Sequence, residues 1–600
     1  MHFIFTYPRM GREAGPASGQ WLCAGRLAGS CHLIAVIAIC ASASCQDSPQ
    51  PPANSSAGPL TAVHGLVRNG VSGEPLPRAL VRINGDGATG VLTDGEGRFE
   101  ISDVAEGPET VTVIKPGFLD HLEAVADSSM SDARDYVHSV IVAPEMGDVV
   151  FTMNPLNSIR GQIRLSTGDV AEGFQVALLK RTMQDGRAIW QSAASARTNS
   201  EGVYRFGELS DGLYAVYTEP AMDSEAANYL LAAGSGNNVP RQGYASVFYP
   251  EAHDLTGAAK ISLAGGQQAE ASIALTHEPF YSVTATVTSP KAEGAGGENV
   301  SVQVMDAQRH PLPYTAQYDE ATHTAQAALP DGRYSMLATA TPNLGTGTVT
   351  FAERFNAVGM ASHSFTGEVS FTVASRAVSN LRLPLSAPGS APVQVMVERG
   401  PGGISQIDDP RVFVTLSQTG GWMSDGIVSS YAEGAASEGV LQTMPTPPGS
   451  FWVHTSVGTK QICEASFTAG GASLGREPLV LGVAGASAPL VLTLRDDCAK
   501  LTLSLPDSVG LSAGEERSYT VYVVPDFDST QDVVPQTLRP STGGRITLIG
   551  LTPGSYHVYT FDRPVALEYR NSAVLATLPG QAVSLAPDQE AELTIEVAQR

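Results

Sequence analysis

Apolar and polar residues alternate in short runs along most of the chain after residue 60. In the stretch Thr61 to Asp120, such runs begin at Val63, Ala79 and Val111. Turn-forming segments rich in Gly, Asn, Asp and Pro separate the runs at intervals of roughly 8–12 residues. This spacing is typical of an antiparallel β-sandwich, in which one face of each strand is buried. The pattern therefore predicts an all-β protein.

The same pattern restarts further along the chain, near Ser158, Tyr281, Val393 and Leu501. Four of the units contain a corner in which a glycine lets the backbone turn and a Tyr or Phe two residues later is expected to enter the core. These corners are Gly212/Tyr214, Gly332/Tyr334, Gly449/Phe451 and Gly554/Tyr556. A self-similar unit of this size indicates domains in tandem. We expect a tandem array of about five immunoglobulin-like antiparallel β-sandwich domains, with the ranges 61–157, 158–277, 278–388, 389–497 and 498–600.

The first unit carries a more specific set of short motifs. They are Val63-His64-Gly65, Ser72-Gly73-Glu74-Pro75-Leu76, Ala79-Leu80-Val81, Thr93-Asp94-Gly95-Glu96-Gly97-Arg98-Phe99 and Lys115-Pro116-Gly117-Phe118. This set resembles the carboxypeptidase regulatory-like domain, a small transthyretin-like sandwich that follows the peptidase domain in some metallocarboxypeptidases. The resemblance implies an accessory, non-catalytic domain with a carbohydrate-binding-like fold. Within the unit, Val81 and Phe99 are expected on the inner face.

Residues 1–45 read as an export signal. Three arginines (Arg9, Arg12 and Arg26) precede the apolar run 33–40, and small residues follow it. The apolar run is well short of the ~20 residues that a membrane-spanning helix needs. Residues 46–60, rich in Pro, Gln and Ser, are expected to form a flexible linker.

Two cleavage sites remain open. Cleavage after Ala41-Ser42-Ala43 would give a freely secreted protein. Ala43-Ser44-Cys45 resembles the end of a lipobox, although Ser42 stands where that pattern prefers Leu, Val or Ile, and Cys45 would then carry a lipid anchor. Either way the protein is expected to be exported, and to be extracellular, periplasmic or attached to the cell surface.

Only two of the six cysteines, Cys463 and Cys498, lie in the body of the chain. In an exported protein they most simply form a disulfide. The closed loop of ~35 residues would contribute on the order of 3 kcal/mol. Neither cysteine has His or Cys neighbours at metal-ligand spacing, so we expect no metal site there.

The net charge of −24 argues against nucleic acid as a partner, since phosphate binding needs a basic surface. The sequence also contains few motifs that are typical of catalysis or ligand binding. Gly85 to Gly90 and Gly510 to Gly514 match short nucleotide-binding and hydrolase patterns, but no helical pattern follows either one, so both are interpreted as turns. Oxygen-bearing side chains that could bind calcium are better explained as turn residues; they are Asn84, Asp86, Asp94 and Glu96.

No metallopeptidase motif occurs among the histidines, so we expect no enzymatic activity, no metal and no cofactor. The expected function is non-catalytic binding of carbohydrate or of a surface or extracellular protein, as an adhesin or scaffold. Trp422, in a Gly-rich turn, is the candidate for stacking on a sugar ring. Two alternatives stay open: an accessory subunit or divergent hydrolase acting on surface polymers, and a structural spacer. A membrane contact is expected only through the alternative N-terminal lipid anchor.

Overall fold

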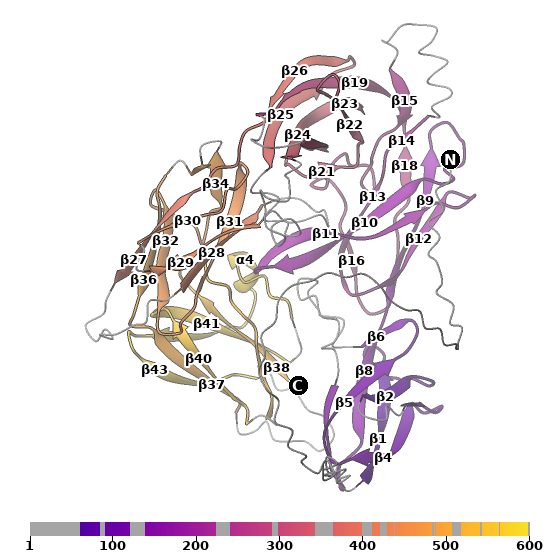
Figure 1. Cartoon of the computed structure of the whole chain (residues 1–600). Coiled ribbons are helices and arrows are strands. Elements are labelled where there is room, and N and C mark those ends of the chain that lie inside the picture. Colours follow the sequence, from indigo (N-terminus) through magenta and orange to yellow (C-terminus); the bar gives the residue numbers. More distant parts are fainter. Residues whose placement is uncertain are drawn as a thin grey trace, which may run out of the picture. The chain divides into compact units, whose positions relative to one another are not determined.

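Figure 1 shows the computed structural model of the chain. It describes residues 60–84, 90–120, 138–223, 240–290, 298–342, 364–398, 411–419, 429–436, 439–482, 485–486, 488–506, 518–540, 543–562 and 565–597. Nearly all regular structure in these ranges is β, as the sequence predicts, and the described part of the chain contains one α-helix, α4 (Ser572–Leu575).

The first sandwich has two four-stranded sheets, with the orders β4-β1-β8-β6 and β3-β2-β5-β7. Its strands are β1 (Leu60–Asn69), β2 (Leu80–Asn84), β3 (Gly90–Leu92), β4 (Arg98–Ala105), β5 (Gly107–Ile114), β6 (Phe118–Asp120), β7 (His138–Val142) and β8 (Val149–Pro155). Alternate residues of β4 are buried. Val81 and Phe99 are buried in the core between the sheets, which confirms their expected place.

The second sandwich has one sheet of order β11-β10-β13-β16 and a second in which β9 pairs with β12, β17 and β18. Its strands are β9 (Asn157–Leu165), β10 (Gln175–Gln184), β11 (Arg187–Arg197), β12 (Val203–Leu209), β13 (Gly212–Thr218), β16 (Ile261–Leu263), β17 (Gln268–Glu270) and β18 (Ile273–Leu275). Strands β10 and β11 form a long hairpin that ends at residues 185–186.

The third sandwich contains strands on both sides of the expected boundary at residue 277. Its strands are β14 (Ala221–Met222), β15 (Arg241–Tyr244), β19 (His277–Thr288), β20 (Glu298–Met305), β21 (Pro311–Leu312), β22 (Ala316–Asp319), β23 (Thr324–Leu329), β24 (Gly332–Pro342), β25 (Phe365–Val373) and β26 (Val378–Pro384). The sheet orders are β14-β15-β19-β23-β22, with β26 also on β19, and β21-β20-β24-β25. The first four residues of β19 pair with β15, and the following ones pair with β23. This sheet therefore includes a segment that precedes residue 277.

The fourth and fifth sandwiches follow the same plan. The strands of the fourth sandwich are β27 (Pro392–Glu398), β28 (Arg411–Gln418), β29 (Ser429–Ala435), β30 (Val440–Gln442), β31 (Gly449–Val457), β32 (Cys463–Ala469), β33 (Ala472–Ser473), β34 (Leu479–Gly482), β35 (Gly485–Ala486) and β36 (Leu490–Arg495). The strands of the fifth sandwich are β37 (Ala499–Ser504), β38 (Tyr519–Pro525), β39 (Gln536–Leu538), β40 (Arg545–Leu551), β41 (Gly554–Phe561), β42 (Gln581–Leu585) and β43 (Glu590–Thr594). The prediction of a tandem array of about five β-sandwiches is confirmed; the residue boundaries between domains stay a proposal.

One pairing rule recurs in every sandwich. The first strand of each unit, or β19 in the third, pairs antiparallel with a neighbour and parallel with a strand near the end of the same unit. The parallel pairs are β1·β8, β9·β17, β19·β26, β27·β36 and β37·β43. One sheet of each sandwich is therefore mixed, where the sequence pattern predicted antiparallel pairing, and the other sheet is antiparallel as predicted. Because the first and last strands run in the same direction, the chain enters each sandwich at one end and leaves at the other.

The glycine–aromatic corners do what the sequence predicts. Tyr214, Phe451 and Tyr556 are buried, at 1%, 1% and 4% exposure. The Tyr214 hydroxyl donates to the Ser210 carbonyl at 2.7 Å, and Tyr556 donates to the carbonyl of Thr552 at 2.6 Å. Because the ring is buried while its hydroxyl satisfies the backbone of the same corner, a tyrosine at this position fixes the turn, whereas Phe451 contributes a buried ring alone.

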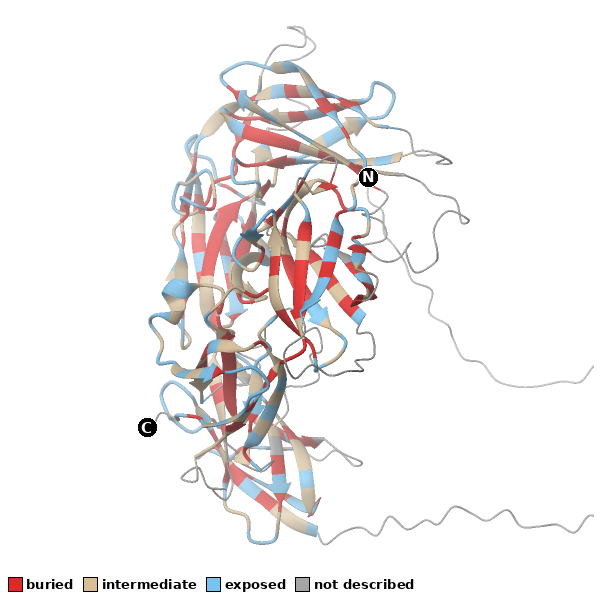
Figure 2. Cartoon of the chain, turned by 90° about the vertical axis from the view of Figure 1, so that its left-hand side faces the viewer, coloured by how far each residue is buried: buried red, intermediate tan, exposed pale blue. Residues whose placement is uncertain are grey.

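Each sandwich has its own core between its two sheets, visible as the buried residues along the strands in Figure 2. The second and fifth sandwiches carry an additional small apolar cluster on the opposite face of a sheet. In β13 and β38 nearly every residue is buried, so both faces of these strands are covered. The cluster of the fifth sandwich includes Tyr522, Tyr559 and Tyr569. It adjoins the candidate site described next.

Candidate functional site

The tip of the β10–β11 hairpin is a two-residue turn made by Asp185 and Gly186. Both residues have positive φ, 49° and 70°. An Asp-Gly pair tolerates this conformation and favours the turn type that matches strand twist. The strands hold their register up to the turn, with Gln184 paired to Arg187. The hairpin is therefore a well-defined arm projecting from the second sandwich.

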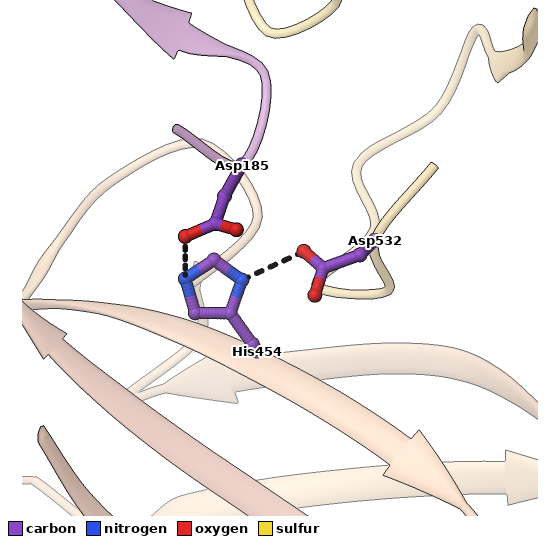
Figure 3. Close-up of side chains that lie close together, drawn as sticks. All are labelled: Asp185, His454 and Asp532. Atoms are coloured by element: carbon purple, nitrogen blue, oxygen red, sulfur yellow. Dashed lines mark hydrogen bonds and ion pairs between the residues drawn. The ribbon is translucent and has the colours of Figure 1, made fainter. Parts of the chain in front are cut away.

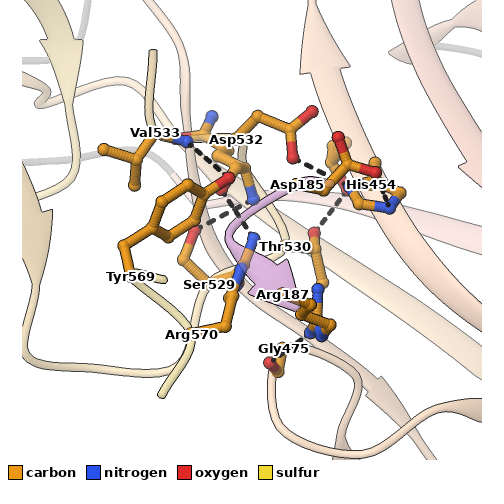
Figure 4. A network of polar contacts seen from close by, with 12 residues as sticks. Asp185, Arg187, His454, Gly475, Ser529, Thr530, Asp532, Val533, Tyr569 and Arg570 are labelled. Carbon is orange, nitrogen blue, oxygen red and sulfur yellow. Dashed lines mark hydrogen bonds and ion pairs between the residues drawn. The ribbon is translucent and has the colours of Figure 1, made fainter. Parts of the chain in front are cut away.

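This tip contacts the fifth sandwich through its backbone (Figure 4). The Arg570 amide donates to the Gly186 carbonyl at 3.0 Å. A Cβ atom built on Gly186 would lie 2.5 Å from the ring of Tyr569, so only glycine fits against this ring. On the flank of the hairpin, the Arg181 guanidinium pairs with the Glu568 carboxylate at 2.6 Å. Side chain and backbone together dock the arm.

Arg187 extends the contact to the fourth sandwich. Its guanidinium lies 3.6 Å from the centroid of the Trp452 ring, and its Nη2 donates to the Gly475 carbonyl at 3.5 Å. A guanidinium over an indole face is attracted by the ring quadrupole, the more so when water is excluded. Burial, with the nearby Arg570 as a second cause, lowers the pKa of Arg187 to about 10. Arg187 stays charged at neutral pH.

At the centre of the contact, His454 lies between two carboxylates (Figure 3). Its Nδ1 is 2.8 Å from Oδ1 of Asp532, and its Nε2 is 3.5 Å from Oδ2 of Asp185. His454 is 7% exposed, and burial raises the pKa of the Asp185 carboxyl. Asp185 comes from the hairpin, His454 from β31, and Asp532 from the segment between β38 and β39. We call these three residues the Asp–His–Asp cluster.

Behind the cluster, Glu464 of β32 joins the fourth and fifth sandwiches. Its Oε1 accepts from the Thr530 amide at 2.7 Å, and its Oε2 accepts from the Thr530 hydroxyl at 2.5 Å. Its backbone carbonyl accepts from the Thr552 hydroxyl at 2.6 Å. Glu464 is 2% exposed, and burial raises its pKa in spite of the hydrogen bonds from Thr530, which act in the opposite direction.

Glu464 gives a prediction with a definite sign. A carboxyl whose pKa is raised by folding stabilises the protein fully below its unfolded pKa, near 4.5, and loses this contribution as the pH rises through its folded pKa. The variant Glu464→Gln should therefore match the wild type at acid pH and become relatively more stable towards neutral pH. Thermal unfolding of both proteins between pH 4 and pH 8 measures the difference.

The control is Glu590→Gln, which removes an exposed carboxyl whose pKa is lowered by Lys500. Because a lowered pKa affects stability only below the unfolded value near 4.5, the difference between this variant and the wild type should stay level from pH 5 to pH 8 and shrink only at more acid pH. A Glu464→Gln difference that does not change with pH would contradict the assignment.

The structure places the predicted site residues as follows. Cys463 and Cys498 form the expected disulfide, with 5.9 Å between their Cα atoms. It joins the start of β32 to the segment between β36 and β37, at the junction of the fourth and fifth sandwiches. Cys45 and Trp422 lie outside the described residues, as do Asp86, the pattern Gly510 to Gly514, and all of the pattern Gly85 to Gly90 except Gly90, which begins β3. They remain predictions.

The turn interpretation of Asp94 agrees with its contacts. Its Oδ1 accepts from the backbone amides of Glu96 and Arg98 at 3.0 and 2.7 Å. Asn199 makes the same two bonds, to Glu201 and Val203, in the corresponding turn of the second sandwich. An acidic or amide oxygen at this position is therefore used to close a turn.

Sequence reasoning missed the Asp–His–Asp cluster, because its members are far apart in the chain and each is unremarkable alone. One local signal was Asp185-Gly186, a pair that strongly favours a hairpin turn. This pair predicts the hairpin but does not indicate what its tip contacts. The run of apolar residues on both faces of β38 was a second signal, since it implies a second covered face.

The first sandwich is similar in sequence to a known domain family. Residues 62–131 match the family model of the carboxypeptidase regulatory-like domain. The first sandwich is such a domain. This carboxypeptidase regulatory-like domain occupies only the start of the array and contributes no residue to the Asp–His–Asp cluster.

Solved structures also match at low similarity. The Bacillus anthracis TIE protein matches with 11% identity and a TM-score of 0.14, over 66% of this chain and 62% of that one. The minor pilin GBS52 of Streptococcus agalactiae matches with 13% identity and a TM-score of 0.19, over 36% and 97%. The shaft pilin SpaA of Lactobacillus rhamnosus GG matches with 12% identity and a TM-score of 0.18, over 37% and 98%. A search of curated proteins gives no match. Among the described residues, no helix is long and apolar enough to cross a membrane.

Proposed function

We propose that this chain is an exported, non-catalytic scaffold that binds another protein at the cell surface. The observation that carries the proposal is the docked hairpin: Gly186 and Arg187 of the second sandwich contact both the fourth and the fifth. Ion pairs, a cation–π contact and backbone hydrogen bonds are used there to fix three sandwiches against one another. A fixed arrangement suits a binding scaffold, because a preorganised surface loses little entropy on association.

The hydrolase alternative meets a chemical objection at the Asp–His–Asp cluster. A catalytic histidine needs one ring nitrogen on an orienting carboxylate and the other on a nucleophile or a water. Here Nδ1 faces Asp532 and Nε2 faces Asp185. In the described part of the chain, neither nitrogen hydrogen-bonds a hydroxyl or a thiol. The cluster therefore supports a structural or ligand-holding role.

The second hypothesis is that the protein binds a carbohydrate rather than a protein. The two described tryptophans of the body are not free platforms, because Arg187 covers Trp452 and Lys260 lies 5.3 Å from the Trp190 ring. Sugar stacking would then depend on Trp422. Export and the choice between a secreted and a lipid-anchored form at Cys45 belong to the same proposal, and mass spectrometry of the native N-terminus decides between them.

The test is a binding screen of the full chain against cell-surface proteins and glycans, run together with Gly186→Ala and Trp422→Ala. We expect a protein partner, weaker binding by Gly186→Ala and unchanged binding by Trp422→Ala. If the wild type binds a glycan and Trp422→Ala does not, the carbohydrate hypothesis would be favoured. Turnover of a surface polymer that is lost in His454→Gln would overturn the non-catalytic assignment, and a lack of any ligand would favour a spacer.

A further inference from the structure

We propose that the Asp–His–Asp cluster binds a divalent transition-metal ion of the zinc type, with Asp185 and His454 as ligands and Asp532 orienting the imidazole. The three side chains each offer one ligand atom, and these atoms all lie within 4.8 Å of one another. Carboxylate and imidazole groups are a donor set that zinc accepts. This inference is independent of the proposed scaffold function.

The first observation is the state of the imidazole. Nδ1 lies 2.8 Å from the Asp532 carboxylate, so this nitrogen carries the proton and donates it. In the neutral tautomer, which is the form that binds a metal ion, the lone pair of Nε2 then points towards Asp185. Nε2 is buried and has no hydrogen-bond partner, and His454 as a whole is 93% buried, since 7% of it is exposed. A buried, unsatisfied nitrogen costs free energy unless something binds it.

The second observation is the distance from Nε2 to Oδ2 of Asp185, 3.5 Å. This is longer than a hydrogen bond of the usual ~2.9 Å. With zinc–nitrogen and zinc–oxygen bonds near 2.1 Å at a tetrahedral angle, the two ligand atoms would be roughly 3.4 Å apart. A metal-bound histidine typically donates its other N–H to a carboxylate, as His454 does to Asp532.

The third observation is charge. Among the described residues, Asp185 and Asp532 lie within ion-pair distance of His454 only. The two nearby arginines act on Asp185 only at a distance, because Arg187 lies on Trp452 and Arg570 donates to the carbonyls of Ser529 and Gln531. Two carboxylates thus converge on a single imidazole. A divalent cation would offset their charge, while the arginines would limit its affinity.

The ion would connect three sandwiches, because Asp185, His454 and Asp532 come from the second, fourth and fifth. Metal binding should therefore stabilise their docking as well as the cluster itself. By linkage, a ligand that binds only the docked form shifts the equilibrium towards it. Zinc should raise the temperature at which the second sandwich separates from the others.

The experiment uses the full chain after treatment with a chelator, titrated with Zn²⁺ by calorimetry and with Co²⁺ by visible absorption. We expect one ion whose binding is lost in Asp185→Asn and weakened about 10- to 100-fold in Asp532→Asn, the usual effect of removing an orienting carboxylate. Asparagine tolerates the positive φ of residue 185, so the turn should persist, and circular dichroism checks the fold.

The matched control is Asp526→Asn. Asp526 forms an ordinary two-residue pair with His557, at 2.6 Å from its Nδ1, without a second carboxylate. This variant should bind Zn²⁺ and Co²⁺ as the wild type does. If the wild type binds neither ion, the cluster is only a polar contact and the proposal fails. It fails equally if Asp185→Asn and Asp532→Asn both bind with unchanged affinity, because the ion then binds elsewhere.

Discussion

Replacing Gly186 with alanine is expected to release the β10–β11 hairpin from the fourth and fifth sandwiches. The new methyl group would meet the Tyr569 ring at 2.5 Å, and the residue has a φ of 70°, which L side chains rarely adopt. Strain of this backbone and overpacking against a buried ring together should cost roughly 2–4 kcal/mol. Because Arg187 and Asp185 depend on the same turn, their contacts should be lost together.

Scanning calorimetry measures this result, since sandwiches that no longer contact one another should unfold in separate transitions. Gly168→Ala is the matched control. Gly168 has a φ of 86° and nothing within 4 Å of an added Cβ, so this variant introduces backbone strain without a clash. It should lower stability by only about 1–2 kcal/mol and leave the docking intact. Equal effects of the two variants would contradict the docking account.

Removing the Cys463–Cys498 disulfide is the second large effect that we expect. The bond closes a loop with a sequence separation of 35, which on the chain-entropy model stabilises the fourth sandwich by roughly 3–4 kcal/mol. The double variant Cys463→Ala/Cys498→Ala should unfold correspondingly earlier in denaturant. It should also loosen the fifth sandwich, because β37 begins directly after Cys498.

Reducing the wild-type protein measures the effect of breaking the disulfide without the side effects of replacing two cysteines. A reductant should destabilise the wild type by about as much as the double variant and should leave the double variant unchanged. If the reductant has no effect on the wild type, the two thiols are not bonded in solution.

Much of the fold follows from local patterns in the sequence. Alternation placed Val81 and Phe99 in the core, and the glycine–aromatic spacing placed Tyr214, Phe451 and Tyr556 there. These features succeed because the turn, the strand and the buried ring lie within a few residues of one another. The disulfide was also predictable, because two body cysteines have few other uses in a chain that is expected to be exported.

The candidate site was not predictable, because its energy comes from contacts between separate sandwiches. Asp185, His454 and Asp532 each occupy an ordinary strand end, strand or loop, and no spacing rule links them. The same holds for β15, whose pairing with β19 across the expected boundary depends on tertiary contact. Local patterns specify each sandwich, whereas their docking is specified by side chains that only the folded chain brings together.

Hydrogen exchange at the Arg570 amide tests the docked hairpin most directly. This amide donates to the Gly186 carbonyl, so its protection depends on the hairpin being in place. We predict that site-resolved exchange is slow at Arg570 in the wild type and fast in Gly186→Ala, while amides in the β38–β41 pair stay protected in both. Equally fast exchange at Arg570 in both proteins would contradict the account.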